Sequence, residues 1–301
     1  MARAGRDYTV DEQPGVWRSP EPGPEQTTGL RERAPADDNR HQRPGSSHCS
    51  RAEHREQAAD RQFQFSDSEA RTLVDLGTFR ALSLQDLSRV RYGGDEKQTR
   101  LELNRLIGHQ GLIRRSTTYP DRSIYLTLTR KGQRAIEGPK PINVSPWQVF
   151  YHGFVKPREA KHDAAPYRIY QAQAERIARA GGRADRVVLD FDLKRSINRK
   201  LAKLSSLPQA ERSQRRQEVA QEHGLRVVNG KIPIPDVRIE CETAEREMAK
   251  VELELAAGHY HRAHLAAKIQ AGFSIYALPE DAVRLRPAMA DPEIMQEIFS
   301  L

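Results

Sequence analysis

The apolar residues of the chain begin to recur at helical spacing near residue 63. Ser66 and Glu69 occupy the two positions of a capping box, and a run of apolar residues at helical spacing follows them. A second short helix is expected after Ser83, and a third over residues 96–110 after the capping residue Asp95. The pattern therefore predicts three successive helices.

The third expected helix is amphipathic. Its inward face is predicted to carry Leu101, Leu103, Leu106 and Ile107. Its outward face is predicted to carry Lys97, Arg100, Asn104 and Arg105.

Two runs of alternating polarity follow Gly111 and predict a β-hairpin. They meet at residues 119–122, where Pro120 presets one backbone dihedral and Asp121 can bond its own backbone. The hairpin ends in the segment LTRKG.

The second half of the chain has a different order of elements. Residues 138–146 read as a linker because of their glycine and prolines, and order resumes near Trp147. The pattern then predicts a helix, a strand, a pair of basic helices, two more strands, a helix over residues 259–271 and a strand over 272–278.

The strands of the second half carry several carboxylates. The first is expected over RVVLDFDL, which places Asp190 and Asp192 on one face. Another run begins at Ile232 and contains Pro235-Asp236. The next, residues 249–256, alternates strictly, so Glu252 and Glu254 point the same way.

Composition bounds the class of protein. The 301 residues suffice for two domains, and residues 1–62, rich in proline and charge, are expected to form a disordered leader. Cys49 and Cys241 show no CxxC spacing, which argues against a disulfide framework and favours a reducing cytoplasm. No apolar run approaches the ~20 residues that span a bilayer, so no membrane partner is expected.

Positive charge is concentrated in the first folded half. Residues 61–140 carry 15 Lys or Arg against 9 Asp or Glu, a balance of +6 within a total of +8. Such a block predicts a polyanionic partner, and a solvated surface is the alternative.

Three helices followed by a hairpin make residues 63–137 similar to a winged helix-turn-helix domain. The resemblance implies double-stranded DNA as partner, with the third helix in the major groove and the hairpin along the backbone. A winged helix used only for protein contacts is the alternative. The residues implied to meet DNA are Lys97, Gln98, Arg100, Asn104, Arg105, Arg114, Arg115, Arg122 and Arg130.

A second basic surface is predicted on the helical pair. Residues 194–216 contain eight Lys or Arg and the single acid Glu211, so Arg199, Lys200 and Arg215 are expected to contact the DNA backbone. A solvated face is the alternative.

The second half, residues 147–280, resembles the PD-(D/E)XK nuclease fold, an α-β-β-β-α-β domain, here with a basic helical insertion. The resemblance implies that Glu175, Asp236 and Glu252 hold a divalent metal. Glu254 stands where the family has lysine, and Lys268 is the candidate to supply that charge. The overall class expected is mixed α+β or α/β, ending in a tail at 281–301.

The chemistry explains why these residue types are wanted together. Phosphodiester hydrolysis needs a hard cation such as Mg²⁺ or Mn²⁺ on carboxylate oxygens, and a lysine to offset developing charge. Alternatively, Glu252 and Glu254 form the solvent face of an edge strand. His259, His261 and His264 are expected on a helix surface rather than on a transition metal.

The two halves together resemble the replication-relaxation family of plasmid and integrative-element proteins, in which His162 resembles a histidine at the start of the second domain. That resemblance implies a DNA-binding protein acting in replication, relaxation or mobilisation, with a metal-dependent nicking activity. A homodimer and replication or mobilisation proteins are further candidate partners. The alternative is a non-catalytic regulator or replication accessory protein on a decayed nuclease-like scaffold.

Overall fold

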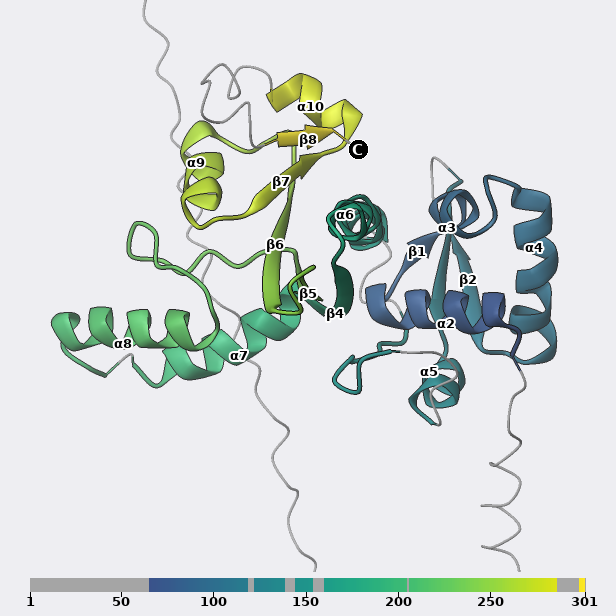
Figure 1. Ribbon diagram of the computed structural model, residues 1–301, viewed down its shortest axis with the longest axis horizontal. Helices are drawn as coiled ribbons and strands as arrows, with labels where there is room; N and C mark the ends of the chain where they lie inside the picture. The colour runs from purple at the N-terminus through teal and green to yellow at the C-terminus, as the bar shows by residue number, and fades with distance from the viewer. Residues whose placement is uncertain are drawn as a thin grey trace, which may run out of the picture. The chain divides into compact units, whose positions relative to one another are not determined.

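The computed structural model describes residues 65–118, 122–138, 144–153, 160–204, 206–285 and 298–300. The expected leader, the turn at residues 119–121 and most of the expected linker and tail lie outside these ranges. The described chain is a mixed α+β protein with one three-stranded and one five-stranded sheet (Figure 1).

The first half confirms the predicted order of three helices and a hairpin. Strand order in its sheet is β1-β3-β2, and both pairs are antiparallel, so β2 is an edge strand. The elements are α2 (Asp67–Phe79), β1 (Leu82–Ser83), α3 (Leu84–Arg91), α4 (Glu96–Asn104), β2 (Ile113–Thr117), β3 (Ile124–Leu128) and α5 (Arg130–Glu137).

Local sequence explains where these helices begin. The Ser66 side chain accepts from the Glu69 backbone, and the Glu69 side chain accepts from the Ser66 backbone, which is the reciprocal capping box. Asp95 caps α4 by accepting from two backbone amides. Fully buried leucines, such as Leu73 and Leu126, then fix the helices to the sheet.

Three details of the first half differ from the expectation. Helix α4 continues as a π-helix, η1 (Arg105–His109), rather than as a regular helix to residue 110. Leu101 is 67% exposed, because the register of α4 buries Thr99 and Leu103 instead. Arg130 begins helix α5 and does not belong to a hairpin strand, since the Thr129 side chain caps a helix there.

The second half forms the five-stranded sheet with strand order β4-β5-β6-β7-β8. Strands β4, β5 and β6 run antiparallel, whereas β7 runs parallel to β6 and β8 parallel to β7. The elements are α6 (Ala160–Arg179), β4 (Arg183–Leu189), α7 (Asp190–Ala202), α8 (Gln209–Glu222), β5 (Val237–Glu242), β6 (Met248–Ala256), α9 (Arg262–Gln270), β7 (Ser274–Ala277), α10 (Pro279–Leu285) and β8 (Ile298–Ser300).

The expected order of helix, strand, helical pair, two strands, helix and strand is found here, with three corrections. Strand β4 ends at Leu189, so Asp190 and Asp192 lie in the first turn of α7, where negative charge suits the helix dipole. Strand β5 begins only at Val237, because Pro233 and Pro235 cannot donate to a ladder. Residues 298–300, expected in a tail, form the last strand of the sheet.

Helix α6 connects the two halves. Tyr167 Oη donates to Asp75 Oδ2 of α2 at 2.9 Å, and Arg168 Nε donates to Asp86 Oδ1 of α3 at 2.6 Å. One hydrophobic cluster contains apolar residues from both sheets and from α6. The described residues after 64 accordingly belong to one compact unit.

Candidate functional site

Asp236 lies at the entry of strand β5, beside the neighbouring strand β6. Its backbone amide donates to Leu253 O at 3.0 Å, and its Oδ2 accepts from the Leu255 amide at 2.9 Å. These two bonds hold the Asp236 carboxyl next to Glu254, the residue between those partners.

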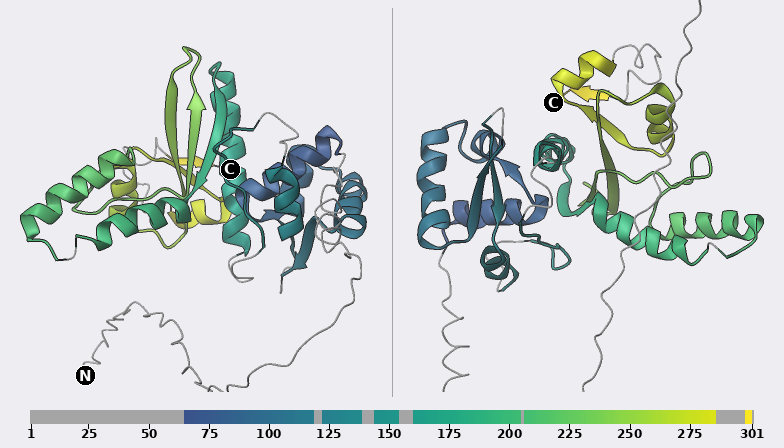
Figure 2. Two further views of the ribbon diagram at one scale, coloured as in Figure 1. Left: turned by 90° about the horizontal axis from the view of Figure 1, so that it is seen from below. Right: turned by 180° about the vertical axis from the view of Figure 1, so that it is seen from behind.

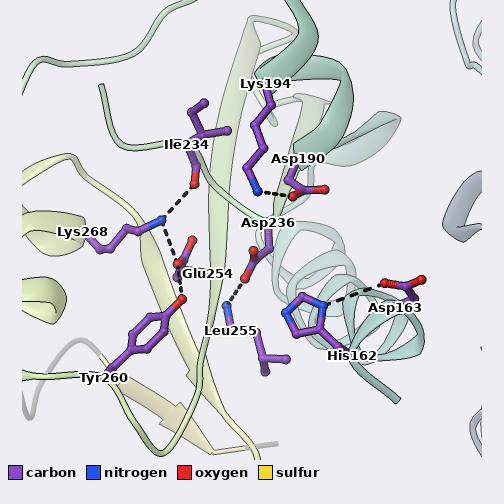
Figure 3. Close-up of polar contacts among 10 residues, drawn as sticks. All are labelled: His162, Asp163, Asp190, Lys194, Ile234, Asp236, Glu254, Leu255, Tyr260 and Lys268. Carbon is purple, nitrogen blue, oxygen red and sulfur yellow. Dashed lines mark hydrogen bonds and ion pairs between the residues drawn. The ribbon is translucent and has the colours of Figure 1, made fainter. Parts of the chain in front are cut away.

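Glu254 forms the centre of a buried polar cluster with residues from the following segment. Its Oε1 lies 2.7 Å from Lys268 Nζ of α9 and accepts from Tyr260 Oη at 3.0 Å. The Lys268 amine also donates to Ile234 O at 2.9 Å, so one side chain connects β6 with the segment before β5 (Figure 3). Only 1% of Glu254 is exposed.

The environment makes these carboxyls weak acids. Burial, together with the nearby Asp236 charge, raises the pKa of Glu254 to about 7, although Lys268 and Tyr260 act in the opposite direction. Burial also raises the pKa of Asp236, against the effect of its bond from Leu255. Two ionisable groups therefore share one site and disfavour each other's charge.

A second set of charged residues lies on the other side of Asp236. The Asp190 amide donates to Asp236 O at 3.1 Å, and Asp190 Oδ2 accepts from Lys194 Nζ at 2.5 Å. His162, in the first turn of α6, has a raised pKa because of Asp163, whose carboxyl lies 3.9 Å from Nδ1, with a further contribution from Asp236. Figure 3 shows the His162 ring beside the Asp236 carboxyl, and Asp190 bonded to Lys194 on the other side of Asp236.

The predicted metal triad does not assemble. Glu252 pairs instead with Arg238, its cross-strand partner, at 2.7 Å, and both side chains are buried. Glu175 is exposed and pairs with Arg179 at 2.9 Å. Thirteen residues of α6 separate it from His162, which at 1.5 Å per residue is about 20 Å along the helix.

The cluster that does assemble contains Asp236, Glu254 and Lys268, three of the five candidate site residues, which also include Glu175 and Glu252. Glu254, not Glu252, is the acid that lies beside Asp236. Ala256, and not the lysine of the nuclease motif, stands two residues after Glu254. Tyr260, Asp190 and Lys194 were not predicted. Tyr260 lies among histidines in the sequence, and Asp190 lies in a segment whose alternation predicts a strand, so neither residue carries a usable signal.

The donor set fits a single hard cation only in part. Within the described residues, no three His, Cys, Asp or Glu side chains converge to form a metal site. Two carboxylates do lie together, and Glu254 Oε2 is buried without a hydrogen-bond partner in the described chain. Mg²⁺ is commonly held by one or two carboxylates, with waters and substrate phosphates completing its shell.

The predicted DNA-binding residues of the first half are exposed, but several are already paired. Arg100 pairs with Glu96 at 2.9 Å, and Arg105 pairs with the buried Glu69 at 2.9 Å. Gln98 donates to Glu102 at 3.0 Å. Five of these predicted residues are cations that form no ion pair within the described chain: Lys97, Arg114, Arg115, Arg122 and Arg130.

A hollow of about 490 Å³ lies between α4, η1 and strand β2. Asn104 lines it from the end of α4, and Arg114 and Arg115 line it from β2. Two adjacent arginines and an exposed amide therefore border one depression, although the side chains of consecutive strand residues leave opposite faces of the sheet.

The predicted residues of the basic helical pair also divide into paired and unpaired groups. Lys200 pairs with Glu222, and Arg215 pairs with Glu218 at 2.7 Å. Arg199 is exposed and has no ion pair in the described part of the chain. None of the described helices is long and apolar enough to cross a membrane.

Comparison with known proteins gives little. No protein-family model matches the chain, and no curated protein matches it. Two chains of solved structures match, one of them the crystal structure of NadR in complex with 4-hydroxyphenylacetate. That alignment has 18% identity, covers 56% of this chain and 99% of the other, and has a TM-score of 0.22, so it supports no conclusion about fold or function.

Proposed function

We propose that this protein binds double-stranded DNA through its first half, used as a winged helix. The observation that carries the proposal is the pair Arg114 and Arg115, which lie exposed on edge strand β2 beside the polar end of α4. Neither has an acidic partner in the described residues. Unpaired guanidinium groups beside a helix end favour phosphate contacts.

Helix α4 suits the major groove. Its exposed residues Lys97, Arg100 and Asn104 lie on the side opposite the buried Thr99 and Leu103. A helix of this diameter enters the groove of B-form DNA, and side chains on its outer face reach base edges.

The test is duplex binding measured by fluorescence anisotropy over a range of salt concentrations. Arg114→Glu with Arg115→Glu is expected to reduce affinity at least tenfold and to lower the salt dependence. The matched control, Arg179→Glu with Arg246→Glu, makes the same change of charge at the end of α6 and in the turn between β5 and β6, outside the winged helix, and is expected to leave affinity nearly unchanged. Equal effects of the two double variants would contradict the proposal.

Metal-dependent cleavage of DNA is the second candidate function, and it is favoured by the convergence of Asp236, Glu254 and Lys268. When bound, Mg²⁺ or Mn²⁺ would polarise the phosphoryl group and acidify a water molecule. Asp236 and Glu254 would hold it, Tyr260 would orient Glu254, and the Lys268 amine would offset negative charge on the substrate.

Incubation of supercoiled plasmid with Mg²⁺ or Mn²⁺ tests this candidate. Nicking by the wild type that is lost in Asp236→Ala and retained in Glu175→Ala would support it. Binding without cleavage under either metal would favour the other assignment, a non-catalytic regulator or replication accessory protein on a nuclease-like scaffold. A role in the replication, relaxation or mobilisation of a plasmid or integrative element rests on the resemblance to the replication-relaxation family alone.

A further inference from the structure

We propose that the outer face of helix α7 binds the sugar-phosphate backbone of duplex DNA and leads it to the Asp236–Glu254 cluster. This inference rests on the proposed DNA-binding function and adds a second contact, separate from the winged helix. The surface consists of Arg195, Arg199 and Lys203, and is called the α7 basic face below.

The three cations occupy one side of the helix, with Lys203 at its C-cap in helical backbone conformation. They are spaced by four residues, so successive members are rotated by only about 40° in a helix of 3.6 residues per turn. Leu193, Ile197 and Leu201 are spaced in the same way, on the opposite side, and pack into a hydrophobic cluster with α8 and the segment after it. The core therefore fixes the α7 basic face toward solvent.

The three cations of this face have no acidic partner among the described residues, whereas charged residues near them do. Arg195, Arg199 and Lys203 are exposed and form no ion pair with the described residues. Asp192, three residues before Arg195, accepts instead from the Tyr151 hydroxyl. On the same hairpin, by contrast, Lys200 pairs with Glu222.

The spacing of these cations is unfavourable in the free protein. Like charges four residues apart on a helix repel each other and destabilise it by a few tenths of a kcal/mol per pair. The α7 basic face contains two such contacts in succession, Arg195 with Arg199 and Arg199 with Lys203. A polyanion on this face would replace repulsion with attraction, which a merely solvated surface does not do.

Helix α7 starts beside the carboxylate cluster and leads away from it, so the α7 basic face extends outward from the cluster. The helix begins at Asp190, whose amide bonds to Asp236 O at 3.1 Å, and Lys194 pairs with Asp190 one turn later. From Arg195 the face extends about 12 Å along the helix. Figure 2 shows α7 and α8 projecting from the sheet as an antiparallel hairpin.

The length of the face matches a polyanion better than a small anion. Duplex DNA carries one charge per about 1.7 Å of axis, so a 12 Å face lies along about seven phosphate charges. A row of three cations then contacts phosphates without reading bases, which predicts binding that does not depend on sequence.

The experiment compares two triple variants of the full chain that make the same change of charge. Arg195→Gln with Arg199→Gln and Lys203→Gln removes the α7 basic face. The control, Arg179→Gln with Arg183→Gln and Arg246→Gln, removes three exposed cations outside the hairpin, at the end of α6, at the start of β4 and in the turn before β6. Glutamine has good helix propensity, and thermal melting checks that both variants fold.

The measured quantity is the slope of log affinity for duplex DNA against log salt concentration. Loss of three phosphate contacts is expected to reduce that slope by up to about 2.7, whereas the control changes it by less than 1. A hydroxyl-radical footprint is expected to shorten on one side only. A folded α7 variant with the wild-type slope and footprint would overturn the inference.

The same titrations separate this inference from the proposed function. If the wild type binds no duplex at low salt, both are wrong. If the Arg114→Glu and Arg115→Glu variant loses binding while the α7 variant behaves as wild type, the winged-helix proposal stands and only the inference about α7 is overturned.

Discussion

The Lys268 amine lies 2.7 Å from Glu254 Oε1, although the two residues belong to different elements, α9 and β6. Lys268 is 9% exposed and Glu254 is 1% exposed, so the ion pair is almost completely removed from water. Such a pair costs desolvation energy, which its geometry must offset. Its bonds to Tyr260 and Ile234 O supply part of that compensation.

Replacement of Lys268 by methionine is expected to destabilise the protein strongly. The change leaves the Glu254 carboxyl buried without its cation and Ile234 O without its donor. Breaking a buried pair in this way costs about 3–5 kcal/mol. Urea unfolding measures the loss, and adding Glu254→Gln to the same protein is expected to recover part of it. If the double variant is as unstable as the sum of the single variants, the two side chains do not act as a pair.

The stability of the protein is expected to depend on the protonation of Glu254. Its pKa is raised to about 7 in the folded state, from 4.5 in the unfolded chain. The folded protein therefore binds the proton more tightly, and this group stabilises the fold fully below pH 4.5 and loses that contribution as the pH rises toward 7. The change is about 3 kcal/mol.

Glu254→Gln provides the control, because glutamine mimics the protonated acid at every pH. Between pH 4.5 and pH 8 the free energy of unfolding of this variant, relative to wild type, is expected to rise by about 3 kcal/mol. Denaturant unfolding of both proteins at several pH values checks this. Subtracting the wild-type free energy of unfolding from that of the variant removes the contribution of groups that titrate in both. A difference that does not change with pH would show that the carboxyl is not perturbed.

Glu252 and Glu175, the two predicted acids that lie outside the cluster, are expected to differ in how much their replacement destabilises the protein. Glu252→Ala leaves Arg238 buried and unpaired, so it should destabilise the protein by about 3–5 kcal/mol. Glu175→Ala removes half of an exposed pair and should change stability by less than about 1 kcal/mol. Thermal melting separates the two, and similar effects would contradict the burial of Glu252 with Arg238.

Periodicity predicted most elements but could not choose between residues on one face. The alternation of β6 placed Glu252 and Glu254 on the same side, and the expectation that one of them meets Asp236 came from the resemblance to the nuclease fold. Which of them meets Asp236 depends on the register with β5, where Arg238 lies opposite Glu252. Register is a long-range property, and nothing in either segment alone encodes it.

The sequence also did not predict where α7 begins or which face of α4 is buried. RVVLDFDL alternates like a strand throughout, yet the chain turns into α7 at Asp190, where the backbone bonds to Asp236 and the apolar residues Leu193 and Ile197 take up helical spacing. Leu101 fits an inward helical position equally well in the sequence. Helix α4 instead buries Thr99 and Leu103, which leaves Leu101 facing outward, and no local pattern predicts that choice of face.

Arg80 offers a test of how the first half is fixed to helix α7. It follows α2 with φ 67° and ψ −49°, and the Ala81 amide bonds to Phe79 O at 2.7 Å across it, which defines a strained γ-turn. Its guanidinium lies 4.5 Å from the Phe191 ring centroid and 5.8 Å from that of Tyr151.

Two substitutions at Arg80 separate the backbone from the side chain. Arg80→Ala loses the contact with Phe191, worth about 1–2 kcal/mol for a partly desolvated cation over a ring, and keeps the strained φ. Arg80→Gly loses the same contact but relieves the strain, so it should be more stable than the alanine variant by about 1 kcal/mol, after the greater entropy of unfolded glycine is subtracted. Unfolding in urea gives both values. An alanine variant as stable as the glycine variant would mean that residue 80 does not hold a positive φ in the folded protein, and wild-type stability in both would mean that the cation does not contribute to the junction.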